Sequence, residues 1–202
     1  MKLIFILTLT YIFVSSNNIS ANENIENCSI KNVPSKERIF SKNFSGVFNG
    51  KRIDYIASLK EKIIYEKDNP SEPMASFFYT EYIVESDKNR PIIFSFNGGP
   101  GSASLWLHMG VLGPKVIKVP SDASDDGAAP FKIVDNKLSP LSDADLVFID
   151  PIGTGYSRAI GCHEPEEFWG VSEDPKIIAE FIRRWINDNK RWNSPRFILG
   201  ES

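Results

Sequence analysis

Residues 92–104 read IIFSFNGGPGSAS, a short apolar run that passes directly into a glycine-rich turn. The β-branched and aromatic residues of 92–96 predict a strand that is buried on both faces. In the turn, 97–101, three glycines lack a Cβ atom and Pro100 has a fixed φ angle. Such a backbone is rigid in one place and closely approachable in others. We therefore expect this turn to present bare N–H groups to a ligand.

The residues before this strand predict an antiparallel meander. Asn49 and Gly50 separate two alternating segments, and Asn-Gly in that position is the strongest short-range signal for a hairpin. Strands are expected over residues 44–48, 52–55, 62–66 and 75–84. Residues 22–42 are mostly polar, contain one proline, and are expected to form an irregular lead-in.

After the turn, shorter apolar segments alternate with loops. Residues 102–111 are compatible with a short helix, 115–119 with a strand, and 121–130 with a loop rich in serine, aspartate, glycine and alanine. The run DLVFID at 145–150 predicts another apolar strand, and it also ends in a glycine-rich turn, PIGTGYS at 151–157. Two strands that end in such turns suggest one edge of an open sheet where loops meet.

The last segment predicts a helix between two parallel strands. Asp174 and Pro175 indicate a helix start, because aspartate can cap the first turn and proline has no N–H to satisfy there. Five apolar residues then recur at helical spacing and predict a face that packs on a sheet: Ile178, Phe181, Ile182, Trp185 and Ile186. A strand is expected at 196–199. Strand, helix, strand is the unit of a parallel sheet with a right-handed crossover.

The N-terminus has the organisation of an export signal. Lys2 is followed by an apolar run over 3–14 and then by mostly small, polar residues up to Ala21. This order predicts a secretory signal peptide over residues 1–21 and an exported protein, periplasmic or extracellular. An uncleaved N-terminal anchor is the alternative, because Ile19 is bulky for a cleavage site.

The bulk composition fits one globular domain or part of a larger one. The 202 residues are 42% hydrophobic and 24% charged, with a net charge of −3. Acidic and basic residues are interspersed, so we expect no nucleic-acid partner. The spacing of Cys28 and Cys162 and the presence of only two histidines, His108 and His163, give no metal site, and no cofactor is expected. In an oxidising compartment the two cysteines can form a disulfide or remain unpaired thiols.

The sequence finishes on a predicted strand that leads into Gly200, Glu201 and Ser202. Gly-x-Ser after a strand is the first half of a nucleophile elbow, in which a sharp turn holds a serine hydroxyl clear of the sheet. Taken alone, the tripeptide is a weak signal. Acyl transfer at a serine needs an oxyanion hole, which this architecture takes in part from a loop after an earlier strand. The turn at 97–101 stands in the right chain order for that role.

Four motifs in order resemble those of the serine carboxypeptidases: FNGGPGSAS at 96–104, LGP at 112–114, DPIGTGYS at 150–157 and LGES at 199–202. The resemblance covers roughly residues 44–202. It implies an α/β-hydrolase fold, here the N-terminal half of a mixed, mostly parallel sheet, in a domain over residues 43–202 that is truncated at the nucleophile. It also implies a serine-type carboxypeptidase, which hydrolyses the C-terminal peptide bond of peptides or proteins through an acyl-enzyme.

The resemblance implies a role for each motif residue. Ser202 matches the nucleophile, and Gly99 matches an oxyanion N–H donor, with Gly98 in the same oxyanion loop. Asn97 and Glu201 match the groups that hold the terminal carboxylate of the substrate. An amide can bind a carboxylate directly, whereas a glutamate can do so only when protonated, because two anions in one site repel. An acidic optimum is therefore expected.

Two positions depart from the family pattern. The family commonly has a glutamate that partners the one beside the nucleophile, and Val111 stands there in this chain. Ser102 stands where the family has a cysteine. The triad aspartate and histidine follow the serine in this architecture, so His108 and His163 are interpreted as packing or surface residues. The 202-residue chain alone is expected to be inactive and, because its last strand forms an apolar edge, poorly soluble.

Two other functions are compatible with the same residues. A secreted, non-catalytic α/β module could bind peptide C-termini through Asn97. Another α/β hydrolase, such as an esterase, could use the same elbow and glycine loop. Trp106 and Met109, close to the glycine turn, could line a pocket or fill the core, and the core is favoured because large apolar residues are mostly buried for packing.

Overall fold

The computed structural model describes residues 33–85, 89–99, 101–120, 122, 124 and 129–201. The predicted signal peptide (1–21), Cys28 and the predicted nucleophile Ser202 lie outside these residues. No helix in the described ranges is long and apolar enough to cross a bilayer.

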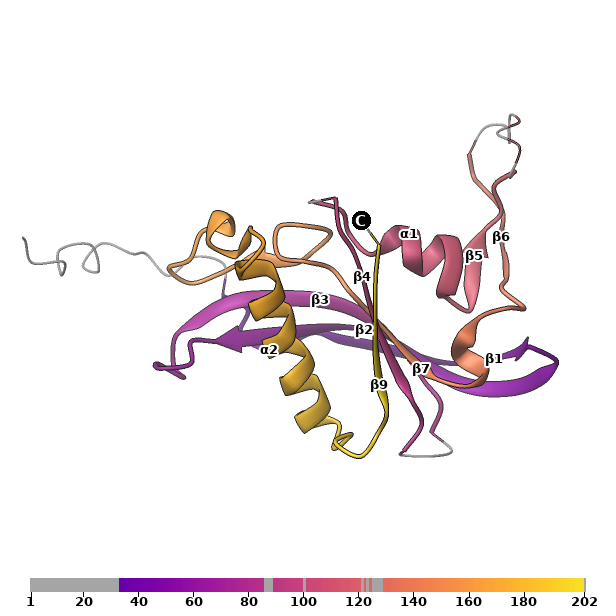
Figure 1. Cartoon of the computed structure of the whole chain (residues 1–202), viewed down its shortest axis with the longest axis horizontal. Helices are drawn as coiled ribbons and strands as arrows, with labels where there is room; N and C mark the ends of the chain where they lie inside the picture. Colours follow the sequence, from indigo (N-terminus) through magenta and orange to yellow (C-terminus); the bar gives the residue numbers. More distant parts are fainter. Residues whose placement is uncertain are drawn as a thin grey trace, which may run out of the picture.

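Strands dominate the described residues, and one long helix lies against them (Figure 1). The strands are β1 (Ile39–Phe48), β2 (Lys51–Tyr65), β3 (Pro73–Ile83), β4 (Ile92–Asn97), β5 (Lys115–Ile117), β6 (Ile133–Asp135), β7 (Asp145–Ile149), β8 (Arg158–Ala159) and β9 (Arg196–Glu201). The helices are α1 (Leu105–Leu107), its π-helical continuation η1 (His108–Leu112), the 3₁₀ turns η2 (Pro140–Ser142) and η3 (Pro165–Phe168), and α2 (Glu173–Asp188).

One mixed sheet carries the fold, which confirms the predicted α/β class. Its strand order is β1-β2-β3-β7-β4-β9, with β8 paired to β3. β4 pairs in parallel with β7 and with β9, whereas the pairs β1·β2, β2·β3 and β3·β7 are antiparallel. The sheet was expected to be mostly parallel. Within the described residues antiparallel pairs are the majority, because the N-terminal meander contributes three strands.

The meander is longer than the sequence predicted. Asn49 and Gly50 form the β1–β2 turn with φ angles of 48° and 76°, the left-handed backbone that favours Asn-Gly in a hairpin. The strands expected at 52–55 and 62–66 are one continuous strand, β2, and β1 begins inside the expected lead-in. Because β1 is an edge strand with mostly exposed residues, it lacks the apolar alternation on which the prediction relied. A further short strand, β6, pairs with β5 outside the main sheet.

Successive side chains of a strand point to opposite sides of the sheet. The central strands are buried on both faces, since a hydrophobic core lies on each side. The core on the α2 face includes Phe77, Tyr79, Phe94, Val147, Phe181 and Trp185. The core on the other face includes Tyr82, Leu107, Leu146 and Phe148, with Ile93 packed against it. This packing fixes the directions of β4 and β7 and therefore the positions of the loops that follow them.

Helix α2 has the apolar face that the sequence predicted. Ile178, Phe181, Trp185 and Ile186 are buried, and Ile182 packs against the same core. The helix starts slightly earlier than expected, with Ser172 at the N-cap position, so Asp174 lies in the first turn instead. Its negative charge there faces the positive end of the helix dipole.

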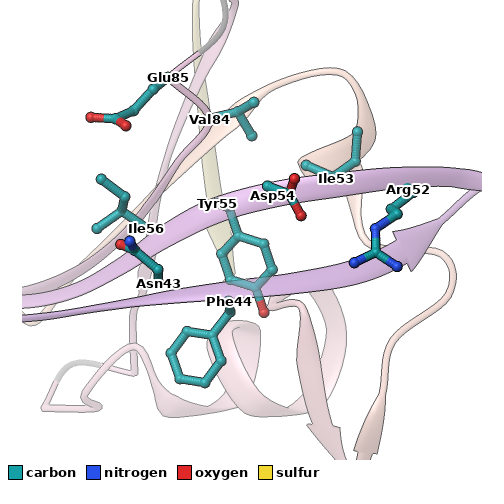
Figure 2. A pocket seen from close by; sticks show the side chains of 9 residues that line it. All are labelled: Asn43, Phe44, Arg52, Ile53, Asp54, Tyr55, Ile56, Val84 and Glu85. Carbon is teal, nitrogen blue, oxygen red and sulfur yellow. The ribbon is translucent and has the colours of Figure 1, made fainter.

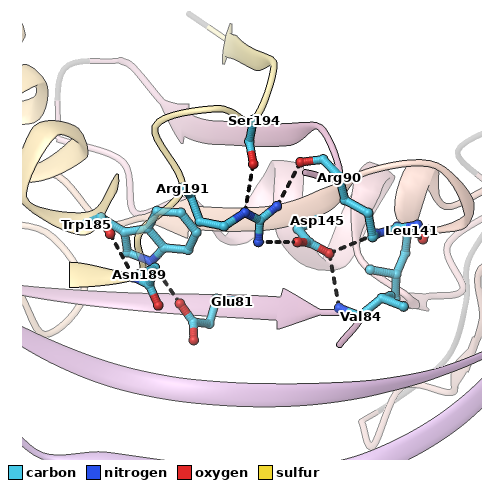
Figure 3. A network of polar contacts seen from close by, with 9 residues as sticks. All are labelled: Glu81, Val84, Arg90, Leu141, Asp145, Trp185, Asn189, Arg191 and Ser194. Atoms are coloured by element: carbon cyan, nitrogen blue, oxygen red, sulfur yellow. Dashed lines mark hydrogen bonds and ion pairs between the residues drawn. The ribbon is translucent and has the colours of Figure 1, made fainter. Parts of the chain in front are cut away.

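A buried polar network holds the amino end of β7 (Figure 3). Asp145 is fully buried and accepts hydrogen bonds from Arg191 Nη1 at 2.8 Å, Arg90 Nε at 3.2 Å and the Val84 N–H at 3.0 Å. Arg191 Nε also donates to Ser194 Oγ at 2.8 Å. Since the buried carboxylate has cationic partners and the guanidinium groups have acceptors, the network tolerates burial and ties the loop after α2 to the sheet.

Candidate active site

The two predicted carboxylate-binding residues lie side by side at the carboxyl ends of parallel strands. Asn97 is the last residue of β4 and Glu201 the last of β9, and the strand register pairs the two directly. Residues more than a hundred positions apart in the sequence are therefore brought together by the parallel pairing. Asn97 is 2% exposed, whereas Glu201 is exposed.

Both polar ends of the Asn97 side chain are engaged. Its Nδ2 donates to Glu201 Oε2 at 2.7 Å, and its Oδ1 accepts the backbone N–H of Leu107 at 3.1 Å. The acceptor contact fixes the orientation of the amide, because only the oxygen can accept from a backbone N–H. The amide group is thus held with its donor side toward Glu201.

The two glycines of the expected oxyanion loop differ in what their N–H groups can do. The Gly98 N–H donates to the Glu201 carbonyl at 2.5 Å, which extends the strand pairing and leaves that donor occupied. The Gly99 N–H has no acceptor among the described residues. Gly99 has a φ angle of +121°, and a Cβ there would lie 3.1 Å from Ser102 Oγ, so the turn needs glycine at this position.

A cavity of about 560 Å³ opens beside these residues. It is lined by Asn97, Gly98, Gly99, Ser102, Trp106, Leu107, Gly110, Val111 and Glu201. Among the described residues of this lining, Glu201 is the only one with an ionisable side chain. These residues can therefore offer an amide and a carboxyl group to a ligand, together with an apolar wall, but no cation.

For Trp106 the core was favoured over a pocket, and that preference is wrong. The Trp106 side chain is 71% exposed and lines the cavity, while the neighbouring Leu107 is the residue that α1 buries. A helix of three residues has one core-facing position, so it cannot bury both. Met109 is half-buried and does not line the cavity. Val111, at the position of the family's partner glutamate, is 59% exposed and faces the same cavity.

The end of β7, just before the second glycine-rich turn, is hydrogen-bonded to Ser104, just after the first. Asp150, directly after β7, accepts the Ser104 N–H on Oδ1 at 2.9 Å, and Ser104 Oγ donates to the Ile149 carbonyl. The loops after these two strands were expected to meet at one edge of the sheet, but the residues that join them were not predicted. The sequence shows that each strand ends in a special turn and does not show that one turn anchors the other.

Neither histidine reaches the cavity. His108 is largely buried: its ring stacks on Phe148 with centroids 4.6 Å apart, and its Nε2 lies 2.6 Å from Tyr82 Oη. Burial lowers the pKa of His108 to about 4. The Nδ1 of His163 lies 2.8 Å from Glu167 Oε2. Their interpretation as packing and surface residues agrees with these contacts.

A second open cavity, of about 520 Å³, lies on the β1–β2 hairpin (Figure 2). It is lined by Asn43, Phe44, Arg52, Ile53, Asp54, Tyr55, Ile56, Val84 and Glu85. The Val84 N–H donates to Asp145 at the amino end of β7, so this cavity lies at the opposite end of the sheet from Asn97. None of the predicted site residues lines it.

The described residues contain no group of three or more histidine, cysteine, aspartate or glutamate side chains that could hold a metal ion. Cys162 takes part in a disulfide, so of the two alternatives left open for it, the unpaired thiol is excluded. Cys28, the other cysteine of the sequence, lies outside the described residues.

Parallel strands whose carboxyl ends carry a glycine loop and a Gly-x-Ser sequence are typical of the α/β hydrolases. A family model described as serine carboxypeptidase matches residues 58–202. Because that match covers well over half of the chain, the chain belongs to the serine carboxypeptidase family, which is an α/β-hydrolase family.

Curated relatives from Arabidopsis thaliana agree with this assignment. Serine carboxypeptidase-like 9 is 27% identical over 166 residues, which are 77% of this chain and 36% of that protein. Serine carboxypeptidase-like 2 and serine carboxypeptidase-like 5 are 30% and 29% identical over 138 residues, 65% of this chain and 29% of each relative. The chain thus spans about a third of the length of the curated relatives that it matches.

Proposed function

We propose that this chain supplies the nucleophile, the oxyanion loop and the leaving-group side of a serine-type carboxypeptidase. The observation that carries the proposal is the hydrogen-bonded pair of Asn97 and Glu201 on the wall of the cavity. Ser202 follows Glu201 directly in the sequence. A peptide C-terminus held by this pair would have its scissile bond close to the serine.

In the proposed mechanism, Ser202 Oγ attacks the carbonyl carbon of the C-terminal peptide bond and forms an acyl-enzyme. The negative charge that develops on the carbonyl oxygen is stabilised by the Gly99 N–H, the loop donor that has no acceptor among the described residues. The Gly98 N–H is held by Glu201 and serves the geometry of the loop. The C–N bond breaks as the acyl-enzyme forms, so the C-terminal residue leaves at that step as a free amino acid. Water then hydrolyses the acyl-enzyme, which releases the shortened peptide and restores the Ser202 hydroxyl.

Asn97 and Glu201 are proposed to hold the terminal carboxylate of the substrate. The Asn97 Nδ2 group can donate one N–H to Glu201 and a second N–H to the ligand. Glu201 contributes a donor only in its protonated form, because two carboxylates in one site repel. Binding of a free C-terminus is therefore expected to be stronger at acidic pH.

The base that accepts the serine proton is proposed to come from a part of the protein outside this sequence. His108 and His163 do not line the cavity, and the chain spans about a third of the length of its curated relatives. Residues 1–21 are proposed to direct export, and peptide or protein C-termini are the proposed substrates. No cofactor is needed for this chemistry.

A second candidate is an esterase of the same fold. It is favoured by one observation: the described cavity has an apolar wall of Trp106 and Val111 and no cation. Such a pocket can accept an uncharged leaving group as well as a carboxylate. Comparing peptide and ester substrates in one experiment separates the two functions.

The test uses the full-length protein and its Ser202→Ala variant. The wild-type protein should release the C-terminal amino acid from a peptide and should react with a fluorophosphonate probe, and the variant should do neither, because no other group supplies the nucleophile. Wild-type release of amino acids by the variant would refute the assignment. Hydrolysis of esters without release of amino acids would favour the esterase.

A further inference from the structure

Asp150 is a half-buried carboxyl group without a cationic partner among the described residues. Burial raises the pKa of the Asp150 carboxyl, and the hydrogen bond from the Ser104 backbone N–H opposes this shift in part. A buried carboxylate is costly unless it is paired with a cation or accepts several hydrogen bonds. The presence of the Asp150 carboxyl group directly after β7 therefore needs a structural or functional explanation.

The contacts of Asp150 lead straight to the glycine loop. Its Oδ1 accepts the Ser104 N–H at 2.9 Å, and the Ile149 carbonyl accepts the Ser104 hydroxyl. Ser104 is 2% exposed and immediately precedes α1. The end of β7 thus holds both donors of the residue at which the short helix begins.

From Ser104 the connection continues to Asn97 through a single turn. The Ser104 carbonyl accepts the His108 N–H at 2.9 Å, which closes this turn. Within it, the Leu107 N–H donates to Asn97 Oδ1 at 3.1 Å. The opposite side of the same amide donates to Glu201 at 2.7 Å. Two hydrogen bonds and one helical turn therefore separate Asp150 from the amide that faces the cavity.

The second glycine turn is shaped to leave room for this carboxyl group. Gly155 has a φ angle of +51°, and a Cβ at that position would lie 2.2 Å from Asp150 Oδ2. A larger residue at position 155 would require the Asp150 carboxyl group to shift. The glycine at 155 and the aspartate at 150 are thus two parts of one arrangement.

We propose that Asp150 is a positioning residue, which fixes the orientation of the Asn97 amide by anchoring Ser104 and the first turn of α1. The hydrogen-bonded chain from Asp150 to Asn97 carries this inference. Its consequence for substrate binding rests on the proposed carboxypeptidase function, whereas its consequence for the order of residues 101–110 does not.

The experiment compares three variants of the full-length protein: Asp150→Ala, Asp150→Asn and the control Asp143→Ala. Asparagine keeps an acceptor oxygen, and Asp143 is an exposed carboxyl group just before the same strand. Backbone hydrogen exchange over residues 101–110 reads out the anchor without any need for activity. Asp150→Ala should raise exchange on the order of tenfold or more, whereas Asp150→Asn and Asp143→Ala should leave it close to wild type.

Kinetics supply the second readout. In Asp150→Ala the KM for a free-carboxylate peptide should rise on the order of tenfold, while the KM for the matching C-terminal amide and the kcat for both should change little. Asp150→Asn should restore the wild-type KM. A merely structural loss would reduce the amount of active protein and would not separate the two substrates.

The outcomes distinguish the inference from the proposed function. Unchanged exchange in Asp150→Ala, or an equal loss in Asp150→Asn, would overturn the positioning role. Raised exchange in a protein whose wild type hydrolyses neither substrate would support the positioning role and contradict the carboxypeptidase. If Asp150→Ala does not fold, Gly155→Ala displaces the same carboxyl group and should show the same raised exchange; wild-type exchange in that variant would overturn the inference.

Discussion

The two ends of β7 each carry one aspartate, and the two carboxyl groups lie in opposite surroundings. Asp145, at the amino end, is fully buried and bound to Arg90 and Arg191 (Figure 3). Asp150, after the carboxyl end, accepts a backbone N–H and has no cationic partner among the described residues. The carboxylate at the amino end of β7 is thus paired with two arginines. The carboxyl group after the other end instead holds the backbone of Ser104.

The same contrast holds for the neighbouring strands. At the carboxyl ends of β4 and β9, the Gly99 N–H has no described acceptor and Glu201 is an exposed carboxyl group held by an amide. Groups that are left available in this way cost stability, and proteins retain them where function needs them. The network at the amino end of the sheet therefore contributes to stability, and the carboxyl end is where the active site is proposed.

The largest expected effect is on the free energy of unfolding, and it comes from removing Asp145 at the amino end of β7. Asp145→Ala leaves the buried Arg191 and the nearby Arg90 without their carboxylate, and should lower the free energy of unfolding by about 3–5 kcal/mol. Urea unfolding of the full-length protein measures this change. Asp143→Ala, which removes an exposed partner of Lys51, should change it little. Equal losses in both variants would show that the buried network is not what stabilises this end.

A smaller effect is expected from His108, which packs on the face of the sheet below α1. Burial lowers its pKa from 6.5 to about 4, so the folded protein favours the neutral ring. The stabilisation that depends on this neutral ring is present above pH 6.5 and is lost as the pH falls toward 4, by on the order of 3 kcal/mol at most. Unfolding free energies measured across this range should fall less steeply in His108→Gln. An identical slope in the variant would exclude His108 as the cause.

The smallest of these effects concerns Val111 at the carboxyl end. Val111→Glu places a second carboxyl group in the cavity that holds Glu201. Two carboxyl groups in one site share a proton more readily than both ionise, so the variant should bind free-carboxylate peptides several-fold better at pH 5 than at pH 7. The ratio of KM values at the two pH values measures this. A ratio equal to that of the wild type would show that Val111 is too far from Glu201 to couple with it.

Local patterns predicted the parts of the fold that depend on local chemistry. Asn49-Gly50 identified a turn, the apolar run at 92–96 identified a strand buried on both faces, and the spacing from Ile178 to Ile186 identified the packed face of α2. The extent of β1 could not be predicted in the same way. It is an edge strand with few buried residues, so its pairing with β2 determines its length more than its own pattern does.

For the candidate site too, local motifs predicted some features, whereas others depend on tertiary packing. Asn97, Gly99 and Glu201 could be named because their motifs require those residue types, and the register of β4 and β9 places Asn97 beside Glu201. The exposure of Trp106 and the anchoring of Ser104 by Asp150 could not be named. Both depend on how a three-residue helix sits against a distant strand, which no local pattern encodes.

The carboxyl end of the sheet is proposed to recognise a substrate carboxylate, and the most direct test is the Asn97→Ala variant of the full-length protein. KM is measured for a peptide with a free C-terminus and for the same peptide with a C-terminal amide. The free-carboxylate peptide should lose on the order of tenfold or more in KM, because the variant removes a hydrogen bond to a charged group. The amidated peptide should change less than about twofold. An equal change in KM for the two peptides would contradict carboxylate recognition by Asn97.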